Sequence, residues 1–471
     1  MLLTVENIQI DSLLLDYSYL VAAILFVIGL KKLSHPDTAR TGNIIAGIGM
    51  ILAMITTVVF HKDGNGKNIP LENIIIIIVT ISIATVIGSV IARKIKMTAM
   101  PQLVSFYNAT GGAASALVAL VEYSNPANES ALVTVLGLVI GSLTFTGSMI
   151  AYGKLDGKVG DIFASFMKYI NIFLLLVIIV MTIYLLAGDI EFADKQKYAY
   201  ILMTISLLYG VMFVMPIGGA DMPVVISLLN SFSGVAAAMA GFIYSNEAMK
   251  LGGILVGASG LILTVLMCKA MNRSLLNVII GAFGGGGAAA DKEAGIIKEI
   301  SVSDASVLLS YTSKVVIVPG YGLAVAQAQH ICAEMVKLLE EKGVEVKFAI
   351  HPVAGRMPGH MNVLLAEADV PYEKLIEMDE INPELPNTDV VVVIGANDVV
   401  NPAAEDDPSS PIYGMPIIKA HTAKNIIVMK RGMGKGYAAI ENYLFYNDKT
   451  RMLFGNAKDS IQKLVTEIKN L

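Results

Sequence analysis

The chain has 471 residues, of which 55% are hydrophobic and only 15% charged, and its mean hydropathy is +0.66. Soluble proteins carry about 25% charged residues, so this composition argues against a wholly soluble protein and suits a membrane domain joined to a soluble one. The formal net charge of −5 argues against a nucleic-acid partner, and two cysteines, Cys268 and Cys332, cannot form a disulfide framework or a metal site.

Nine segments are candidate membrane spans, because crossing a bilayer takes about 20 apolar residues. They are residues 13–30, 44–60, 74–92, 100–121, 131–150, 170–186, 198–215, 224–243 and 251–267. Lys and Arg concentrate in the loops on one side, which the positive-inside rule places in the cytosol. An odd number of spans then places the N-terminus outside and the later, soluble part of the chain in the cytosol.

Two asparagines, Asn108 and Asn230, fall in the middle of predicted spans and are flanked by small residues such as Gly112 and Gly234. Polar side chains at this depth usually face a bundle interior or a wet path. Two interpretations stay open: hydrogen bonding between helices that holds the bundle together, and a functional polar pair. The small residues favour the functional pair, because they allow helices to approach closely around a buried polar seam.

Asp221 lies in a very short turn between the seventh and eighth predicted spans, within the sequence Gly-Gly-Ala-Asp-Met-Pro. One interpretation is a carboxylate that caps the following helix. A carboxylate at the mouth of a proton path would have the same sequence pattern, so both interpretations stay open.

Four consecutive glycines begin at Gly284 and favour a flexible connection between the two halves of the chain. We place this connection at about residues 281–300. The predicted organisation is a transmembrane domain over 1–272, a hinge or linker over 273–300, and a cytosolic domain over 301–471.

The cytosolic half alternates strand patterns with helical stretches. The predicted strands are residues 315–318, 344–350, 389–394, 417–419 and 426–429. This alternation predicts a parallel, doubly wound sheet with ligands at the carboxyl ends of its strands. The expected fold is therefore a polytopic α-helical membrane domain followed by an α/β Rossmann-like doubly wound domain.

The first of these strands is followed by Gly320 and Gly322 and then by helix formers over 323–341. A strand, a glycine turn and a helix in this order place backbone N–H groups where a pyrophosphate can bind. Val325 departs from the usual glycine fingerprint, which has Gly or Ala at that position. The pattern therefore needs support from the other strand ends.

The second strand end favours NADP over NAD. NAD sites commonly place Asp or Glu there to bind the ribose 2′-hydroxyl, whereas this chain continues with His351 and has no acid before His360. Lys430 and Arg431 directly follow a later strand and offer a point charge and a bidentate fork for a phosphate. A solvated charge pair is the alternative for these two residues, and the glycines that follow them favour phosphate binding.

These motifs together resemble the beta subunit of proton-translocating nicotinamide nucleotide transhydrogenase. The resemblance covers essentially the whole chain and is most specific at residues 218–223, 267–274, 351–362 and 395–403. It implies that this chain binds NADP(H), while a partner alpha subunit binds NAD(H) and supplies further membrane helices. Hydride would pass directly between the two nicotinamides while a proton crosses the membrane inward, which generates NADPH. The family also implies a dimer of alpha–beta units in a bacterial inner membrane, with the C-terminal domain in the cytoplasm.

The same resemblance, with the glycine turn after the first strand, assigns the cofactor-binding residues. They are Gly320, Tyr321, Gly322, Val353, Ala354, Gly355, Arg356, Met357, Pro358, Gly395, Ala396, Asn397, Asp398, Val399, Gly414, Met415, Lys430, Arg431, Gly432, Met433, Gly434, Lys435, Gly436, Tyr437, Asn456 and Ala457. Lys430 and Arg431 would hold the 2′-phosphate. Asp398 would lie near the nicotinamide, where its ionisation could report the coupling state.

Asn230 and Asp221 match family positions implicated in the proton path. Some members carry a histidine proton relay where this chain has Asn108. Asparagine cannot titrate, so a histidine relay would come from the partner's helices, or the path would use water and carboxylates.

Two other functions share parts of this pattern. An ion transporter gated by a cytosolic nucleotide-sensing domain would need neither a second nucleotide nor a hydride partner. A membrane-anchored NADP dehydrogenase acting on an organic substrate would need an acid/base constellation, which the sequence does not show.

Overall fold

The computed structural model describes most of the chain. The described residues are 2–61, 68–95, 97–125, 131–160, 166–187, 192–218, 221–272, 274–275, 295–357, 359–410, 412–436, 438 and 440–471. They divide into two compact units. The first unit comprises Met1–Gly153, Tyr169–Val214 and Leu228–Leu261, and the second comprises Lys154–Lys168, Met215–Ser227 and Ile262–Leu471. The limits 1–272, 273–300 and 301–471 stay a prediction, and most of the linker lies outside the described residues.

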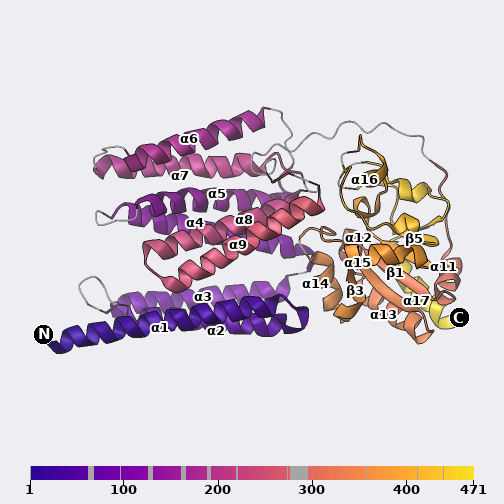
Figure 1. Ribbon diagram of the computed structural model, residues 1–471, viewed down its shortest axis with the longest axis horizontal. Coiled ribbons are helices and arrows are strands. Elements are labelled where there is room, and N and C mark those ends of the chain that lie inside the picture. Colours follow the sequence, from indigo (N-terminus) through magenta and orange to yellow (C-terminus); the bar gives the residue numbers. More distant parts are fainter. Residues whose placement is uncertain are drawn as a thin grey trace. The chain divides into compact units, whose positions relative to one another are not determined.

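Nine helices in the described part of the chain are long and apolar enough to cross a membrane. Their bounds are α1 (Leu2–Leu33), α2 (Pro36–Phe60), α3 (Leu71–Lys94), α4 (Met100–Tyr123), α5 (Ala131–Leu155), α6 (Met167–Ala187), α7 (Phe192–Val214), α8 (Met222–Ile243) and α9 (Glu247–Ala270). Each one overlaps a segment predicted from its hydropathy (Figure 1). Several extend beyond the apolar segment, as α5 does through Lys154, because a helix can continue into the polar interface.

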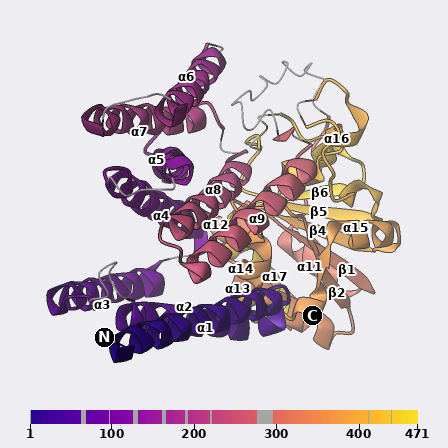
Figure 2. The ribbon, with the colours of Figure 1, turned by 60° about the vertical axis from the view of Figure 1, so that its left-hand side comes forward.

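Small residues bring α4 against α5 and α8 against α9. A Cβ atom added at Gly112 would lie 2.8 Å from the carbonyl oxygen of Gly141, and one at Gly234 would lie 2.9 Å from that of Gly253. These helices therefore pack backbone to backbone, as membrane helices with small interface residues do. Helices α1 and α2 form a hairpin and lie side by side in both views (Figures 1 and 2).

The second unit contains a sheet of six parallel strands in the order β3-β2-β1-β4-β5-β6. Their bounds are β1 (Lys314–Pro319), β2 (Glu345–Ile350), β3 (Leu375–Glu377), β4 (Val390–Ile394), β5 (Asn425–Lys430) and β6 (Thr450–Phe454). The chain runs outward from β1 to β3 and then returns to pair β4 with the other side of β1. This confirms the doubly wound fold and makes the β1–β4 boundary the topological switch point.

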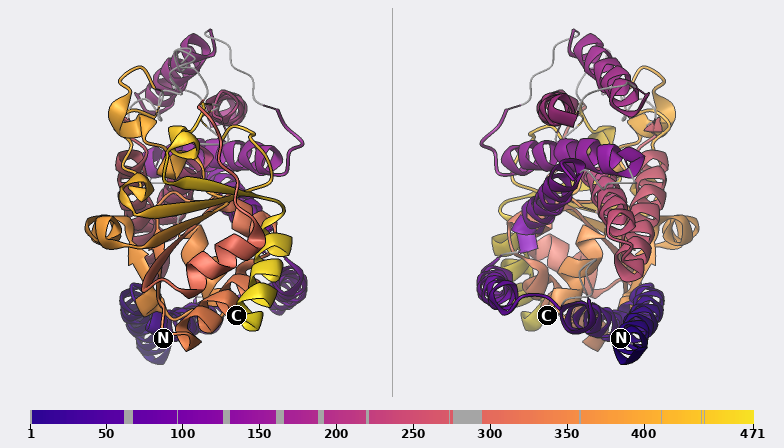
Figure 3. Two further views of the ribbon diagram at one scale, coloured as in Figure 1. Left: turned by 90° about the vertical axis from the view of Figure 1, so that its right-hand side faces the viewer. Right: turned by 90° about the vertical axis from the view of Figure 1, so that its left-hand side faces the viewer.

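Helices and apolar loops cover both faces of this sheet, so its central strands are buried along their length. All five residues of β4 are buried. On one face, Val316, Val318, Val391 and Val393 join a core cluster. On the other side α11 (Val302–Ser310), α13 (Gln329–Glu341) and α17 (Ala457–Asn470) pack together, as the salmon and yellow helices in the left panel of Figure 3 show. Continuous β-branched runs are the sequence pattern of strands buried in this way.

The prediction of a strand at residues 417–419 is wrong. Ile417 and Ile418 are buried, but their backbone groups do not pair with a strand. The N–H of Ile418 donates to the carbonyl of Val399 at 2.9 Å, and the Asn382 side chain donates to the carbonyl of Ile417 at 3.0 Å. Apolar packing thus explains the hydrophobic pattern without sheet pairing.

Two further details differ from the sequence pattern. The helical stretch predicted over 323–341 is two helices, α12 (Tyr321–Val325) and α13, because Gln327 between them has a φ of +50°. Strands β3 and β6 were not predicted. β3 has only three residues and β6 has Arg451 at its second position, so neither gives a long apolar signal.

The turn after β4 yields a stability prediction. Gly395 has a φ of +66°, and a Cβ there would overlap the Cα of Gly322, so Gly395→Ala should lower the free energy of unfolding by roughly 1–3 kcal/mol. Chemical denaturation of the purified chain in detergent would measure this loss. Gly432→Ala is the matched control, because no atom lies within 4 Å of the added Cβ. Equal stability of the two variants would contradict the strain assigned to Gly395.

Candidate functional site

A cavity of about 850 Å³ opens at the carboxyl ends of β1, β4 and β5. It is lined by Gly320, Tyr321, Gly322, Val325, Ala326, Val353, Ala354, Gly355, Gly395, Ala396, Asn397, Asp398, Val399, Met429, Lys430, Arg431, Gly432, Gly434, Lys435, Gly436, Gly455, Asn456 and Ala457. The cavity therefore lies at the topological switch point, where open α/β sheets bind their ligands.

Glycines form the floor of this cavity. The N–H of Gly320 donates to the carbonyl of Ile394 at 2.9 Å, and the N–H of Gly322 donates to that of Gly395 at the same distance. A Cβ at Gly320 would overlap the backbone of Ala396. The chain after β1 thus packs directly against the main chain after β4, which a side chain at Gly320 would prevent.

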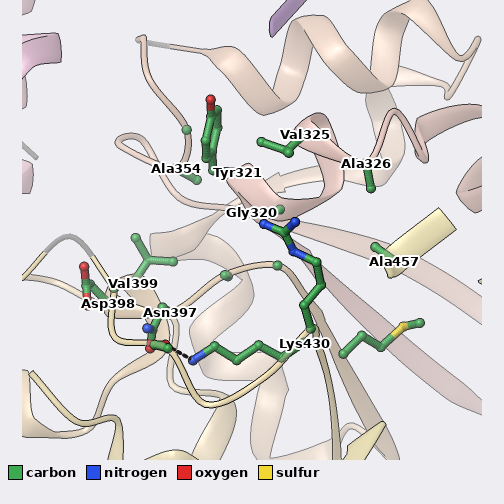
Figure 4. Close-up of a pocket in the computed structure, with 18 of the residues that line it drawn as sticks. Gly320, Tyr321, Val325, Ala326, Ala354, Asn397, Asp398, Val399, Lys430 and Ala457 are labelled. Atoms are coloured by element: carbon green, nitrogen blue, oxygen red, sulfur yellow. Dashed lines mark hydrogen bonds between the residues drawn. The ribbon is translucent and has the colours of Figure 1, made fainter. Parts of the chain in front are cut away.

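Basic side chains follow β5 at the edge of the cavity. The Nζ of Lys430 donates to the carbonyl oxygen of Gly434 at 2.5 Å and lies 4.5 Å from the centre of the Phe445 ring. Burial lowers the pKa of Lys430, and the charge of Asp398 partly opposes that shift. In Figure 4 the Lys430 side chain extends toward Asn397, whereas Tyr321 and Ala354 lie on the opposite side of the cavity. Lys430 and the adjacent Arg431 supply the positive charge that an anionic ligand requires.

The loop after β4 is fastened to the segment that follows β5. The Oδ2 of Asp398 accepts the N–H of Ala438 at 3.0 Å, and a Cβ at Gly436 would lie 2.7 Å from the same oxygen. The side-chain amide of Asn442 donates to the backbone and side-chain oxygens of Asn397 at 2.9 and 3.1 Å. These bonds fix the carboxylate of Asp398 beside the cavity. Asn442 was not predicted, because nothing in its local sequence indicates that it reaches a loop 45 residues earlier.

The second strand end carries a buried histidine where many NAD sites have an acid. The Nε2 of His351 lies 2.8 Å from the carbonyl oxygen of Pro416, and its Nδ1 accepts the N–H of Val353 at 3.2 Å. Burial lowers the pKa of His351 to about 4, despite the opposing backbone hydrogen bond and the charge of Asp379. The ring is therefore neutral, donates through Nε2, and offers no negative charge to a ribose hydroxyl.

A second neutral histidine shapes the same loop. The N–H of Arg356 donates to the Nδ1 of His360 at 3.1 Å, and the Arg356 guanidinium lies 4.5 Å from the centre of the Tyr321 ring. Burial first, and the Arg356 charge second, lower the pKa of His360 to about 4. Arg356 thus reaches the cavity through Tyr321, which lines it.

Most of the predicted cofactor-binding residues lie around this one cavity, but several do not. Met433 lines a small adjoining recess of about 40 Å³. Arg356, Met357, Gly414 and Met415 are not among the lining residues, and Met415 packs in a small core cluster with Ile417. Pro358 and Tyr437 lie outside the described residues.

The structure adds four lining residues that were not predicted: Val325, Ala326, Met429 and Gly455. Met429 and Gly455 lie at strand ends that the fold brings to the same edge. Val325 and Ala326 lie at the end of α12.

Three polar residues of the membrane domain were predicted to take part in a proton path: Asn108, Asn230 and Asp221. Asn108 on α4 is buried, its carbonyl accepts the hydroxyl of Ser233 on α8 at 3.0 Å, and its Nδ2 has no hydrogen-bond partner among the described residues. Asn230 is partly buried and lies three residues before Ser233, on the same face of α8. Asp221 is buried directly before α8, and its carbonyl accepts the N–H of Val224 at 3.2 Å. Their roles in a proton path stay predictions.

Comparison with known proteins decides the family. Residues 15–467 match the family model described as NAD(P) transhydrogenase beta subunit. The chain belongs to this family. NAD(P) transhydrogenase subunit beta of Rhodospirillum rubrum is 46% identical over 466 residues, which cover 95% of this chain and 97% of that protein. A second R. rubrum relative with the same name has the same identity and coverage.

Membership has three direct consequences. A member of the NAD(P) transhydrogenase beta subunit family has a transhydrogenase role and binds a nicotinamide nucleotide. The word beta implies a partner alpha subunit. Together with the nine apolar helices, membership makes the chain a multi-pass membrane protein.

The two neutral histidines predict a pH dependence of stability. Their folded-state pKa of about 4 is below the ordinary 6.5, so the unfolded chain binds more protons between these values and stability falls as the pH falls through that range. At pH 5 each histidine should cost about 2 kcal/mol of unfolding free energy relative to pH 7.

Denaturation of the chain and of His360→Asn at pH 7 and pH 5 would measure this cost. Asparagine keeps an acceptor for the Arg356 N–H without titrating, so the pH-dependent loss should shrink by about 2 kcal/mol. His330→Asn, on an exposed position of α13, is the control. An undiminished loss in His360→Asn would show that His360 does not carry it.

Proposed function

We propose that this chain binds NADP(H) in the cavity at the β1–β4 switch point and, with a partner alpha subunit that binds NAD(H), couples hydride transfer to inward proton translocation. The observation that carries the assignment is the charge pattern at the strand ends. Lys430 ends β5 at the cavity and Arg431 follows it, whereas directly after β2 the chain has the neutral, fully bonded His351 in place of an acid. This pattern suits a nucleotide with an additional phosphate and lacks the carboxylate that a ribose diol would require.

The residues that line the cavity fit an NADP(H) molecule. Gly320, Gly322 and Gly395 line it, and we place the pyrophosphate against this part of the main chain. Lys430 and Arg431 hold the 2′-phosphate, since Lys offers a point charge and Arg a bidentate fork. Bound NADP⁺ accepts a hydride from NADH on the partner subunit to give NADPH and NAD⁺, which balances without any other redox reagent. Asp398 lies at the nicotinamide end, where its fixed carboxylate responds to the charge of the ring.

The membrane domain, residues 1–272, supplies the proton path. Asp221, Asn230 and Asn108 are the polar groups that we assign to this path, and of these three Asp221 alone can exchange a proton. Asn108 orders water or a partner side chain, because its amide nitrogen is buried and unpaired among the described residues. A titratable relay at that depth comes from the partner's helices, or protons pass along water and carboxylates.

The free energy released when one proton crosses the membrane is large enough to shift the hydride-transfer equilibrium toward NADPH. Moving one charge through about 100 mV is worth about 2.3 kcal/mol. This shifts an equilibrium roughly 50-fold, since about 1.4 kcal/mol corresponds to a factor of ten. The two cofactors have nearly equal potentials, so a shift of this size favours NADPH.

The distribution of Lys and Arg between loops supports a cytoplasmic position for the domain over 301–471, and a bacterial inner membrane is the location we propose. The residues over 273–300 link that domain to the membrane helices. A dimer of alpha–beta units is the assembly we propose.

Removal of the proposed phosphate ligands should weaken NADP⁺ binding selectively. Lys430→Ala or Arg431→Ala should raise the NADP⁺ dissociation constant about 10- to 100-fold, because each removes a charge-assisted bond. Calorimetric titration of the detergent-solubilised chain with NADP⁺ and with NAD⁺ would measure both affinities. Lys424→Ala, which removes an exposed lysine at the opposite end of β5, is the matched control. Equal losses for NADP⁺ and NAD⁺ would overturn the 2′-phosphate assignment.

The coupled reaction itself requires the partner. The chain co-purified with an alpha subunit and reconstituted in liposomes should exchange hydride between NADH and NADP⁺ and move protons inward.

Asn230→Ala should make the NADP(H) dissociation constants depend less on pH than they do in the wild type. Pumping of an ion without hydride exchange would favour the nucleotide-gated transporter instead.

A further inference from the structure

The last two residues of α5, Lys154 and Leu155, contact two segments that are far apart in the sequence. One segment is the loop after β2 and the other is the turn that leads from α7 to Asp221. All of these residues belong to the second compact unit. The end of α5 is therefore a structural link within that unit.

Leu155 connects to the loop after β2 through its backbone. Leu155 is the last residue of α5, so its carbonyl has no N–H partner within the helix. The Nη1 of Arg356 donates to this carbonyl at 3.1 Å. The guanidinium thus places a positive charge at the negative end of the helix dipole.

The same guanidinium touches the wall of the cavity. It lies 4.5 Å from the centre of the Tyr321 ring, and Tyr321 lines the cavity. A hydrogen bond from the Arg356 N–H to His360 holds the backbone of the same residue. One guanidinium therefore contacts both the cavity wall and the end of α5.

Lys154 connects the end of α5 to the turn before Asp221. Its Nζ donates to the carbonyl of Met215 at 2.5 Å and to that of Ile217 at 2.9 Å. These carbonyls directly follow the end of α7, where a cation is favourable. The turn then closes through the N–H of Asp221, which donates to the carbonyl of Gly218 at 3.2 Å. The ammonium group thus holds the backbone that carries the Asp221 carboxylate.

We infer that Lys154 is a positioning residue that transmits the state of the nucleotide cavity to Asp221, through Tyr321, Arg356 and the end of α5. This inference rests on the proposed function. It assigns to Lys154 no contact with the nucleotide and no proton transfer. Lys154 controls how strictly proton movement follows hydride transfer, and it leaves nucleotide binding as such unchanged.

The test uses the complete alpha–beta complex in phosphatidylethanolamine–phosphatidylglycerol liposomes with an entrapped pH-sensitive dye. Lys154→Gln should lower the number of protons moved per hydride transferred about tenfold, while the NADP⁺ dissociation constant stays near that of the wild type. Lys154→Arg should restore the ratio, because its guanidinium can donate to both carbonyls. Lys158→Gln removes the same charge from an exposed residue paired with Asp156, and should leave the ratio unchanged.

A second measurement on the wild-type complex does not depend on the folding of a variant. Addition of NADP⁺ should change the hydrogen exchange of the amides over 215–225. In Lys154→Gln, whose overall exchange protection reports whether it folds, this change should be absent. An NADP⁺-independent exchange pattern in the wild type would overturn the inference.

The outcomes separate this inference from the proposed function. A wild-type complex that exchanges hydride but moves no protons would disprove the proposed coupling. A wild-type complex that couples, together with a Lys154→Gln complex that couples equally well, would disprove only the role of Lys154.

Discussion

The contact between the loops after β1 and β4 is the constraint on which the site depends. Gly320 and Gly322 meet Gly395 and Ala396 through main chain, with two hydrogen bonds of 2.9 Å, and any Cβ at Gly320 or Gly395 would separate them. The two loops therefore meet at the switch point through their main chains. The charged side chains that line the cavity are Asp398, from the loop after β4, and Lys430, Arg431 and Lys435, from the end of β5 and the segment that follows it.

In the loop after β2, buried neutral histidines stand where many dinucleotide sites have a carboxylate. In many dinucleotide sites a carboxylate at this strand end selects the ribose diol. Here His351 and His360 are buried and neutral and use ring nitrogens to fix the main chain of the loop. The groups that this loop places near the cavity are therefore its own backbone and the side chain of Arg356. Arg356 of this loop also donates to the backbone of Leu155 at the end of α5.

The membrane helices combine rigid packing with a few unsatisfied polar groups. Backbone contacts at Gly112 and Gly234 fix α4 against α5 and α8 against α9. Between such contacts, the buried amide nitrogen of Asn108 finds no partner among the described residues, which is costly in an apolar bundle unless water or another chain supplies one.

Local sequence patterns predicted the nine apolar helices of the described chain and four of the six strands, because a long apolar run indicates a membrane span and a β-branched run indicates a buried strand. The same reasoning failed at Ile417 and Ile418, whose burial comes from packing and whose backbone is satisfied by Val399 and Asn382. Only the tertiary structure placed Asn442 against Asn397 and Lys154 against the turn before Asp221. Each of these contacts joins two segments that lie tens of residues apart in the sequence, through a side chain and a carbonyl. No periodic pattern in the sequence predicts which distant segments meet.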